Sequence, residues 1–172
     1  PFSTDAWSPI KNAELLMQNT PIALNDKIFD GYNNYWPINS IFGALISEII
    51  LLPPIDSMPL LFPIVGALSI LIFYAIVNIF TGPKISLLAC LLFGTAFSHT
   101  YFTAGITKET YASPIYLLLI FVFIHPRLGS SKRVFLFTLA TIALSLTHHL
   151  TLLFAFFILL SIALAKFVVN IR

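Results

Sequence analysis

The chain has 172 residues, of which 58% are hydrophobic and only 9% are charged, and its net charge is +2 at pH 7. A soluble domain carries about 25% charged residues, so this composition excludes an ordinary soluble enzyme and also a disordered chain. The small net charge disfavours a nucleic-acid partner, and a single cysteine, Cys90, excludes an internal disulfide framework and a cysteine-cluster metal site. We therefore predict an all-α fold, a polytopic transmembrane helical bundle.

Residues 1–57 are the polar and acidic part of the chain, with six acids against two lysines and a net charge of −4. We expect them to form an external loop that carries juxtamembrane helices, the first around Ala13–Met17. Trp36–Leu52 is apolar apart from Glu48, and we interpret it as an interfacial helix lying along the outer membrane surface. If this segment instead spans the membrane, the residues before it move to the cytoplasmic side.

Residues 58–172 are nearly continuous hydrocarbon, with seven Lys and Arg residues, one acid and a net charge of +6. About 20 apolar residues are needed for a helix to span a bilayer. Val134–Ala165 is too long for one untilted span, and we divide it at the pair His148-His149. We therefore expect a bundle of about five helices. The expected spans are 58–80, 85–101, 110–126, 134–147 and 150–168.

The positions of Lys and Arg predict the orientation, because cytoplasmic loops are enriched in both. The basic sites are Lys84, the cluster from Arg127 to Arg133, and Lys166 with Arg172. All of them reach the cytoplasm only if the last apolar run is broken at the histidine pair. This arrangement places residues 1–57, 102–109 and 148–149 on the external side of the plasma membrane.

Several polar segments on this external side share the layout of a known class of membrane enzyme. They are Asp5 before a short helix, Thr20-Pro21, Tyr35-Trp36-Pro37, Thr103–Glu109 and Leu146–His149. The layout resembles the N-terminal module of GT-C class integral membrane glycosyltransferases, such as protein mannosyltransferases, aminoarabinose transferases and oligosaccharyltransferases. The resemblance covers nearly the whole chain. Because the chain begins at Pro1 without the first span of that class, we expect it to be a piece of a longer protein.

The resemblance implies that a sugar passes from a polyprenyl-phosphate-linked donor in the membrane lipid to an acceptor on the external face. Asp5 would be the general base, and Glu109 would be a second catalytic carboxylate. Lys108 and one of the pair His148 and His149 would contact the donor phosphate. In some branches of the class a divalent metal, magnesium or manganese, offsets the phosphate charge, and the candidate ligands are the same two acids.

Each of these residues also has a purely structural interpretation. Asp5 can cap the helix that follows it, Lys108 and Glu109 can form a solvated interfacial pair, and the histidines can satisfy backbone groups at a helix break. Tyr35 and Trp36 suit an aromatic belt at the membrane surface, and they also offer faces on which a sugar can stack.

Two other functions stay open. Ala6 follows Asp5 where the class usually carries a second acid, which favours a non-catalytic structural subunit of a membrane protein complex with other membrane subunits as partners. A transporter ranks last, because transport requires ionisable groups near the bilayer midplane, whereas residues 58–101 contain no charge except Lys84.

Overall fold

The computed structural model describes residues 6–19 and 36–171, with side chains described as far as Val169. These residues form eight helices and no strand, which confirms the predicted all-α fold. The helices are α1 (Trp7–Gln18), α2 (Ile38–Ile50), α3 (Pro54–Thr81), α4 (Pro83–Thr95), α5 (Phe97–Thr103), α6 (Lys108–Ile124), α7 (Ser130–Thr147) and α8 (His149–Ile171).

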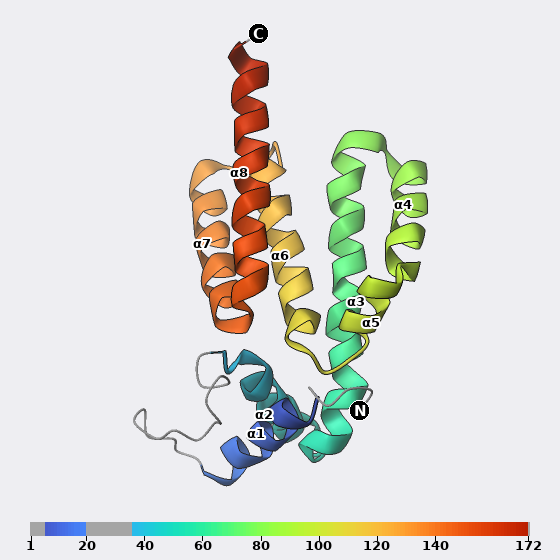
Figure 1. Ribbon diagram of the computed structural model, residues 1–172, viewed down its shortest axis with the longest axis vertical. Helices are drawn as coiled ribbons and strands as arrows, with labels where there is room; N and C mark the ends of the chain where they lie inside the picture. Colours follow the sequence, from blue (N-terminus) through green and yellow to red (C-terminus); the bar gives the residue numbers. More distant parts are fainter. Residues whose placement is uncertain (1–5, 20–35, 172) are drawn as a thin grey trace.

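The molecule has two distinct ends. Figure 1 shows α1, α2 and the beginning of α3 gathered at one end, while the longer helices run along the long axis. Helix α6 lies at the centre of these and contacts α3, α7 and α8. The α3–α4 turn, the α6–α7 loop and the C-terminal end of α8 all lie at the opposite end. The three basic segments of the sequence therefore share one end of the molecule.

Among the described residues, two helical segments are long and apolar enough to cross a membrane: α3, and His149–Val169 of α8. Helices α4 and α5 together make a third candidate, but they are bent by 68° at the break between them. The single helix predicted for residues 85–101 is thus interrupted at Ala96. Helices α6 and α7 have 17 and 18 residues, close to the lower limit for a spanning helix.

Helix α3 begins at Pro54, earlier than the predicted Met58. A proline costs little at the first position of a helix, because the N–H that it lacks has no intrahelical partner there. The beginning of α3 is held to α2 by a buried hydrogen bond of 2.6 Å between the hydroxyls of Ser47 and Ser57. The side chain of Met58 packs against Gly43. These contacts join the α1–α2 end to the longest apolar helix.

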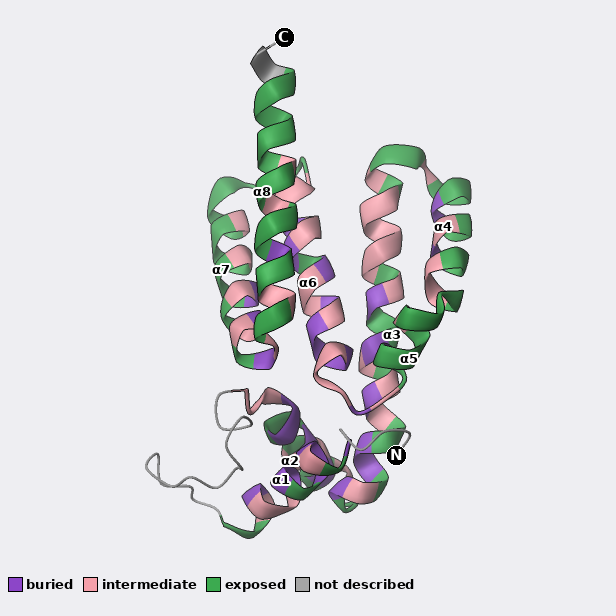
Figure 2. Cartoon of the chain, viewed as in Figure 1, coloured by how far each residue is buried: buried purple, intermediate pink, exposed green. Residues whose placement is uncertain are grey.

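Two buried apolar clusters hold the long helices together. The first includes Ile10 of α1, Phe62 of α3 and Tyr111 of α6, and the second includes Leu119 of α6 and Leu144 of α7. Figure 2 shows that α8 is exposed along much of its length, and only 11% of its apolar stretch is buried. Apolar surface of this extent is typically covered by lipid or by a partner.

Candidate functional site

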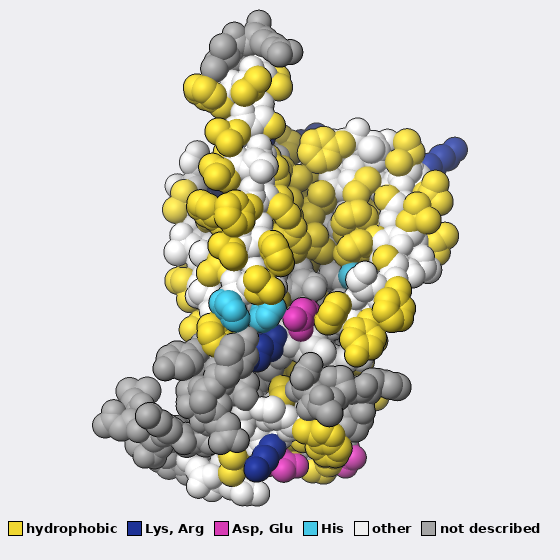
Figure 3. Space-filling view, in the orientation of Figure 1, with side chains coloured by type: hydrophobic (Ala, Val, Ile, Leu, Met, Phe, Trp, Pro, Cys, Tyr) yellow, Lys and Arg dark blue, Asp and Glu magenta, His cyan; other side chains and the backbone are white. Residues whose placement is uncertain are grey.

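Ionisable side chains gather where the long helices meet the α1–α2 end of the molecule. Figure 3 shows histidine, acidic and basic side chains close together at this level. Trp36 precedes α2, Lys108 and Glu109 occupy the first turn of α6, and His148 and His149 lie at the break between α7 and α8. We term these five residues the junction site.

Two threonines fix the first turn of α6. Thr107 is the N-cap residue and forms a capping box with Thr110. The Thr107 hydroxyl donates to the carbonyl of Phe102 at 2.9 Å, and the Thr110 hydroxyl donates to that of Gly105 at 2.5 Å. These bonds tie the loop after α5 to α6. They hold Glu109 in the first helical turn, where the helix dipole also favours a negative charge.

His148 connects three helices. Its extended backbone, with φ −157° and ψ 110°, ends α7 at Thr147 and allows α8 to begin at His149. Its Nδ1 forms a hydrogen bond of 2.7 Å with the hydroxyl of Thr151 in α8. Its Nε2 lies 3.7 Å from the Glu109 carboxylate of α6, and its side chain is only 12% exposed. The orientation of the imidazole is therefore set by contacts on both of its nitrogens.

Trp36 adds an aromatic wall to the junction site. The centroid of its ring lies 4.5 Å from that of the His149 ring, and the Lys108 Nζ lies 5.5 Å from the Trp36 centroid. The second of these distances is within the range of a cation–π interaction. The rings of His148 and His149 lie 5.5 Å apart, so the aromatic side chains extend from the start of α2 to the α7–α8 break.

Burial has the largest influence on the pKa values of Lys108 and His148. Burial lowers the pKa of Lys108, and the neighbouring Glu109 carboxylate partly offsets this change. Burial also lowers the pKa of His148; Glu109 opposes the change, while His149 and Lys108 add to it. Burial therefore favours the neutral form of His148. The site combines a carboxylate, a lysine side chain and an imidazole.

This combination suits the recognition of a phosphate beside a hydroxyl group. An ammonium and an imidazole N–H donate hydrogen bonds to phosphate oxygens. A carboxylate accepts a proton from a hydroxyl that attacks a neighbouring carbon. Because the side chains are partly shielded from water, their electrostatic effect on developing charge is larger than it would be in solution.

The predicted site residues fall into two groups. Asp5 and Tyr35 lie outside the described residues. The structure brings the others together in the junction site: Trp36, Lys108, Glu109, His148 and His149. Sequence reasoning missed Thr151 and Thr110. The spacing from His148 to Thr151 is the i, i+3 spacing of neighbours on a helix, which is the signal that could have found Thr151.

The described residues alone do not fit a divalent metal. Within them, no group of three or more His, Cys, Asp or Glu side chains is placed to hold an ion. Glu109 is the only acid in residues 57–172, whereas magnesium and manganese prefer several oxygen ligands. We therefore derive no step through a metal.

His99 lies apart from the junction site and has a structural role. Its Nε2 forms a hydrogen bond of 2.7 Å with the hydroxyl of Ser69 in α3. Its ring packs on Phe93 of α4, with the centroids 4.1 Å apart. These contacts hold the bent pair of helices α4 and α5 against α3.

No protein-family model, curated protein or solved structure matches this chain. The resemblance to GT-C glycosyltransferases therefore stays a prediction from the sequence.

Proposed function

We propose that this chain is part of a GT-C-type membrane glycosyltransferase of the plasma membrane, with about five spanning helices. It transfers a sugar from a polyprenyl-phosphate-linked donor to an acceptor on the external face. The observation that supports this proposal best is the junction site itself. Glu109 and His148 approach within 3.7 Å, beside Lys108 and Trp36, at the level where the apolar helices end.

The roles follow from the chemistry of these side chains. Lys108 and His148 bind the phosphate of the donor, the first as a cation and the second as a hydrogen-bond donor. Trp36, with His149 and Tyr35, contacts the sugar. Placing the phosphate at the end of apolar helices lets the polyprenyl chain stay in the hydrocarbon of the bilayer.

Transfer is a single displacement at the anomeric carbon. The acceptor hydroxyl gives its proton to a carboxylate while its oxygen bonds to the anomeric carbon. The bond from that carbon to the phosphate oxygen breaks, and polyprenyl phosphate leaves with the electron pair. In this proposal Asp5 is the base, and Glu109 is the second carboxylate, which orients the acceptor and keeps the imidazole of His148 in place.

Replacement of the junction carboxylate tests the proposal. We expect Glu109→Gln to reduce sugar transfer by roughly 100-fold, the usual effect when a reacting group is no longer held in its productive position. The measurement is the transfer of radiolabelled sugar, in membranes that contain the full chain, from a panel of polyprenyl-phosphate sugars. Glu48→Gln is the control, because Glu48 is an exposed acid of α2 outside the junction site. Unchanged transfer by Glu109→Gln would remove Glu109 from the mechanism.

One observation favours the alternative function, a structural subunit of a membrane complex. Most of the apolar stretch of α8 is unburied, with only 11% covered, and a partner helix could cover it. Photo-crosslinking from exposed Phe156 and Phe157 of α8 in native membranes distinguishes the cases. Crosslinks to one defined protein, together with full sugar transfer by Glu109→Gln, would favour the structural subunit.

A further inference from the structure

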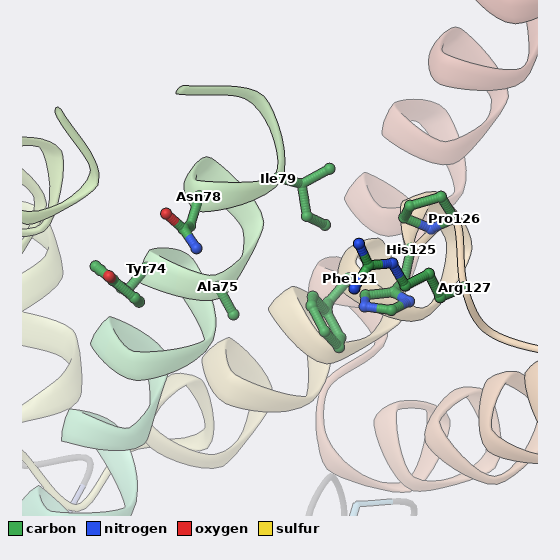
Figure 4. Close-up of a pocket in the computed structure, with 8 residues that line it drawn as sticks. All are labelled: Tyr74, Ala75, Asn78, Ile79, Phe121, His125, Pro126 and Arg127. Atoms are coloured by element: carbon green, nitrogen blue, oxygen red, sulfur yellow. The ribbon is translucent and has the colours of Figure 1, made fainter. Parts of the chain in front are cut away.

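A cavity of about 470 Å³ lies between α3 and α6, far along both helices from the junction site. Figure 4 shows Ala75 and Ile79 of α3 directed across this cavity toward the last turn of α6 and the loop that follows it. The lining residues are Tyr74, Ala75, Asn78 and Ile79 on α3, and Phe121, His125, Pro126 and Arg127 on the other side.

Within the described residues, the region around this cavity is basic and has no acid to balance it. Besides Arg127, the first turns of α4 and α7 carry Lys84, Lys132 and Arg133. Glu109 is the only acid in residues 57–172, and it lies in the first turn of α6, at the other end of that helix. The charge at this end of the molecule is therefore complementary to an anionic ligand.

Two side chains of the α6–α7 loop line the cavity, and hydrogen bonds hold the backbone of this loop. The guanidinium of Arg133 donates to the carbonyls of His125 at 2.9 Å and Leu128 at 3.0 Å, which folds the loop back on itself. Arg127 is exposed and lines the cavity. The Nδ1 of His125 is buried and has no hydrogen-bond partner within the described residues. A buried ring nitrogen without a partner is costly, and the residue that carries it lines the cavity.

We propose that this cavity binds the phosphate headgroup of an anionic phospholipid. Arg127 binds two phosphate oxygens through its planar guanidinium, and His125 supplies a second polar contact. The walls formed by Ala75, Ile79 and Phe121 are apolar and accommodate the glycerol region and the start of the acyl chains. Basic pockets between membrane helices bind anionic lipids in this way. The proposal does not depend on the glycosyltransferase function.

Lipid retention measures this binding directly. The full chain is reconstituted in vesicles of equal parts phosphatidylcholine and phosphatidylglycerol, extracted in detergent, and analysed for bound lipid by native mass spectrometry. We expect phosphatidylglycerol to be retained, and Arg127→Gln to weaken its retention about fivefold, the effect of one arginine near an anionic lipid. Lys132→Gln is the matched control, because it removes one positive charge from the first turn of α7, next to the loop, at an exposed position that does not line the cavity.

A second variant tests the cavity without changing any charge. Ala75→Leu fills space between α3 and α6, and we expect it to reduce retention while thermal unfolding shows that the protein stays folded. Equal losses in Arg127→Gln and Lys132→Gln would indicate diffuse surface attraction and overturn the proposal. It would also be overturned if inorganic phosphate displaced phosphatidylglycerol completely, because the site would then bind free anions rather than lipid.

Discussion

His148 is the residue on which the junction site depends most. It contacts Glu109 of α6 and Thr151 of α8 through different ring nitrogens, and its backbone ends α7. A change in its protonation therefore affects both the packing of three helices and the charge of the site. Because burial lowers its pKa, the neutral form is the one that the folded chain stabilises.

This lowered pKa has a consequence for stability. At acid pH the unfolded chain binds a proton at His148 that the folded chain does not bind, so stability falls as the pH drops below about 6.5. We expect His148→Gln, which cannot be protonated, to flatten the fall in the unfolding temperature between roughly pH 7 and pH 5. Circular dichroism in detergent at several pH values gives the measurement.

His149→Gln is the control for this experiment. His149 is the neighbouring histidine and its side chain is exposed. This variant removes only a lesser cause of the lowered pKa of His148, while burial, the largest cause, remains, so it should keep most of the pH dependence of the unmodified chain. If His148→Gln and the unmodified chain lose stability with falling pH to the same extent, His148 is not the group responsible.

At the scale of elements, α3 crosses α5 at Gly66. Among the glycines of the described residues, this is the one whose missing side chain allows the closest approach of another helix. A Cβ atom added at Gly66 would collide with the backbone oxygen of Thr103. The hydrogen bond between Ser69 and His99 lies beside this crossing. Together these contacts hold α5 at its 68° angle to α4 and so position the loop that leads to the junction site.

Substitution of this glycine tests the crossing. We expect Gly66→Ala to destabilise the protein by about 1–3 kcal/mol, the usual cost of overpacking, because backbone cannot move aside as a side chain does. Gly94→Ala is the matched control, since its added Cβ would meet only the side chain of Ile70, at 3.2 Å. Thermal unfolding of both variants in detergent gives the comparison. A Gly66→Ala variant as stable as Gly94→Ala would show that the two helices can separate without cost.

The same crossing explains where sequence reasoning succeeded and failed. Two helix ends carry local signals in the sequence. The turn after α3 has the pair Gly82-Pro83, and the break after α7 has the polar run Thr147-His148-His149. The bend at Ala96 has no such signal, because it depends on contacts with α3, far away in the sequence. Likewise, alternation of the spans placed Glu109 and His148 at one end of the bundle, but the packing that brings them together could not be read from spacing.

For the whole molecule, the separation of its two ends is the main feature. The acidic α1–α2 end and the three basic segments lie at opposite ends of the long helices. This arrangement is what the positive-inside rule requires if the basic segments face the cytoplasm. The junction site and the α3–α6 cavity would then face opposite sides of one membrane.

Labelling of single cysteines tests this topology. In a Cys90→Ala background, we expect Gln18→Cys to react with an impermeant maleimide in intact cells. Lys84→Cys and Ser131→Cys should react only after permeabilisation, because these exposed positions lie at the basic end. Labelling of Gln18→Cys and Lys84→Cys from the same side would contradict the proposed arrangement.

The unequal lengths of the helices have a consequence for the surrounding bilayer. At about 1.5 Å per residue, the 17 residues of α6 extend about 26 Å, whereas the 23 residues of α8 extend about 35 Å. A hydrocarbon core of about 30 Å is thicker than the first length and thinner than the second. Hydrophobic mismatch of this kind is relieved by thinning the bilayer beside the short helix. Lipid headgroups would then sink toward the end of α6, while the longer α8 would have to tilt within the same bilayer.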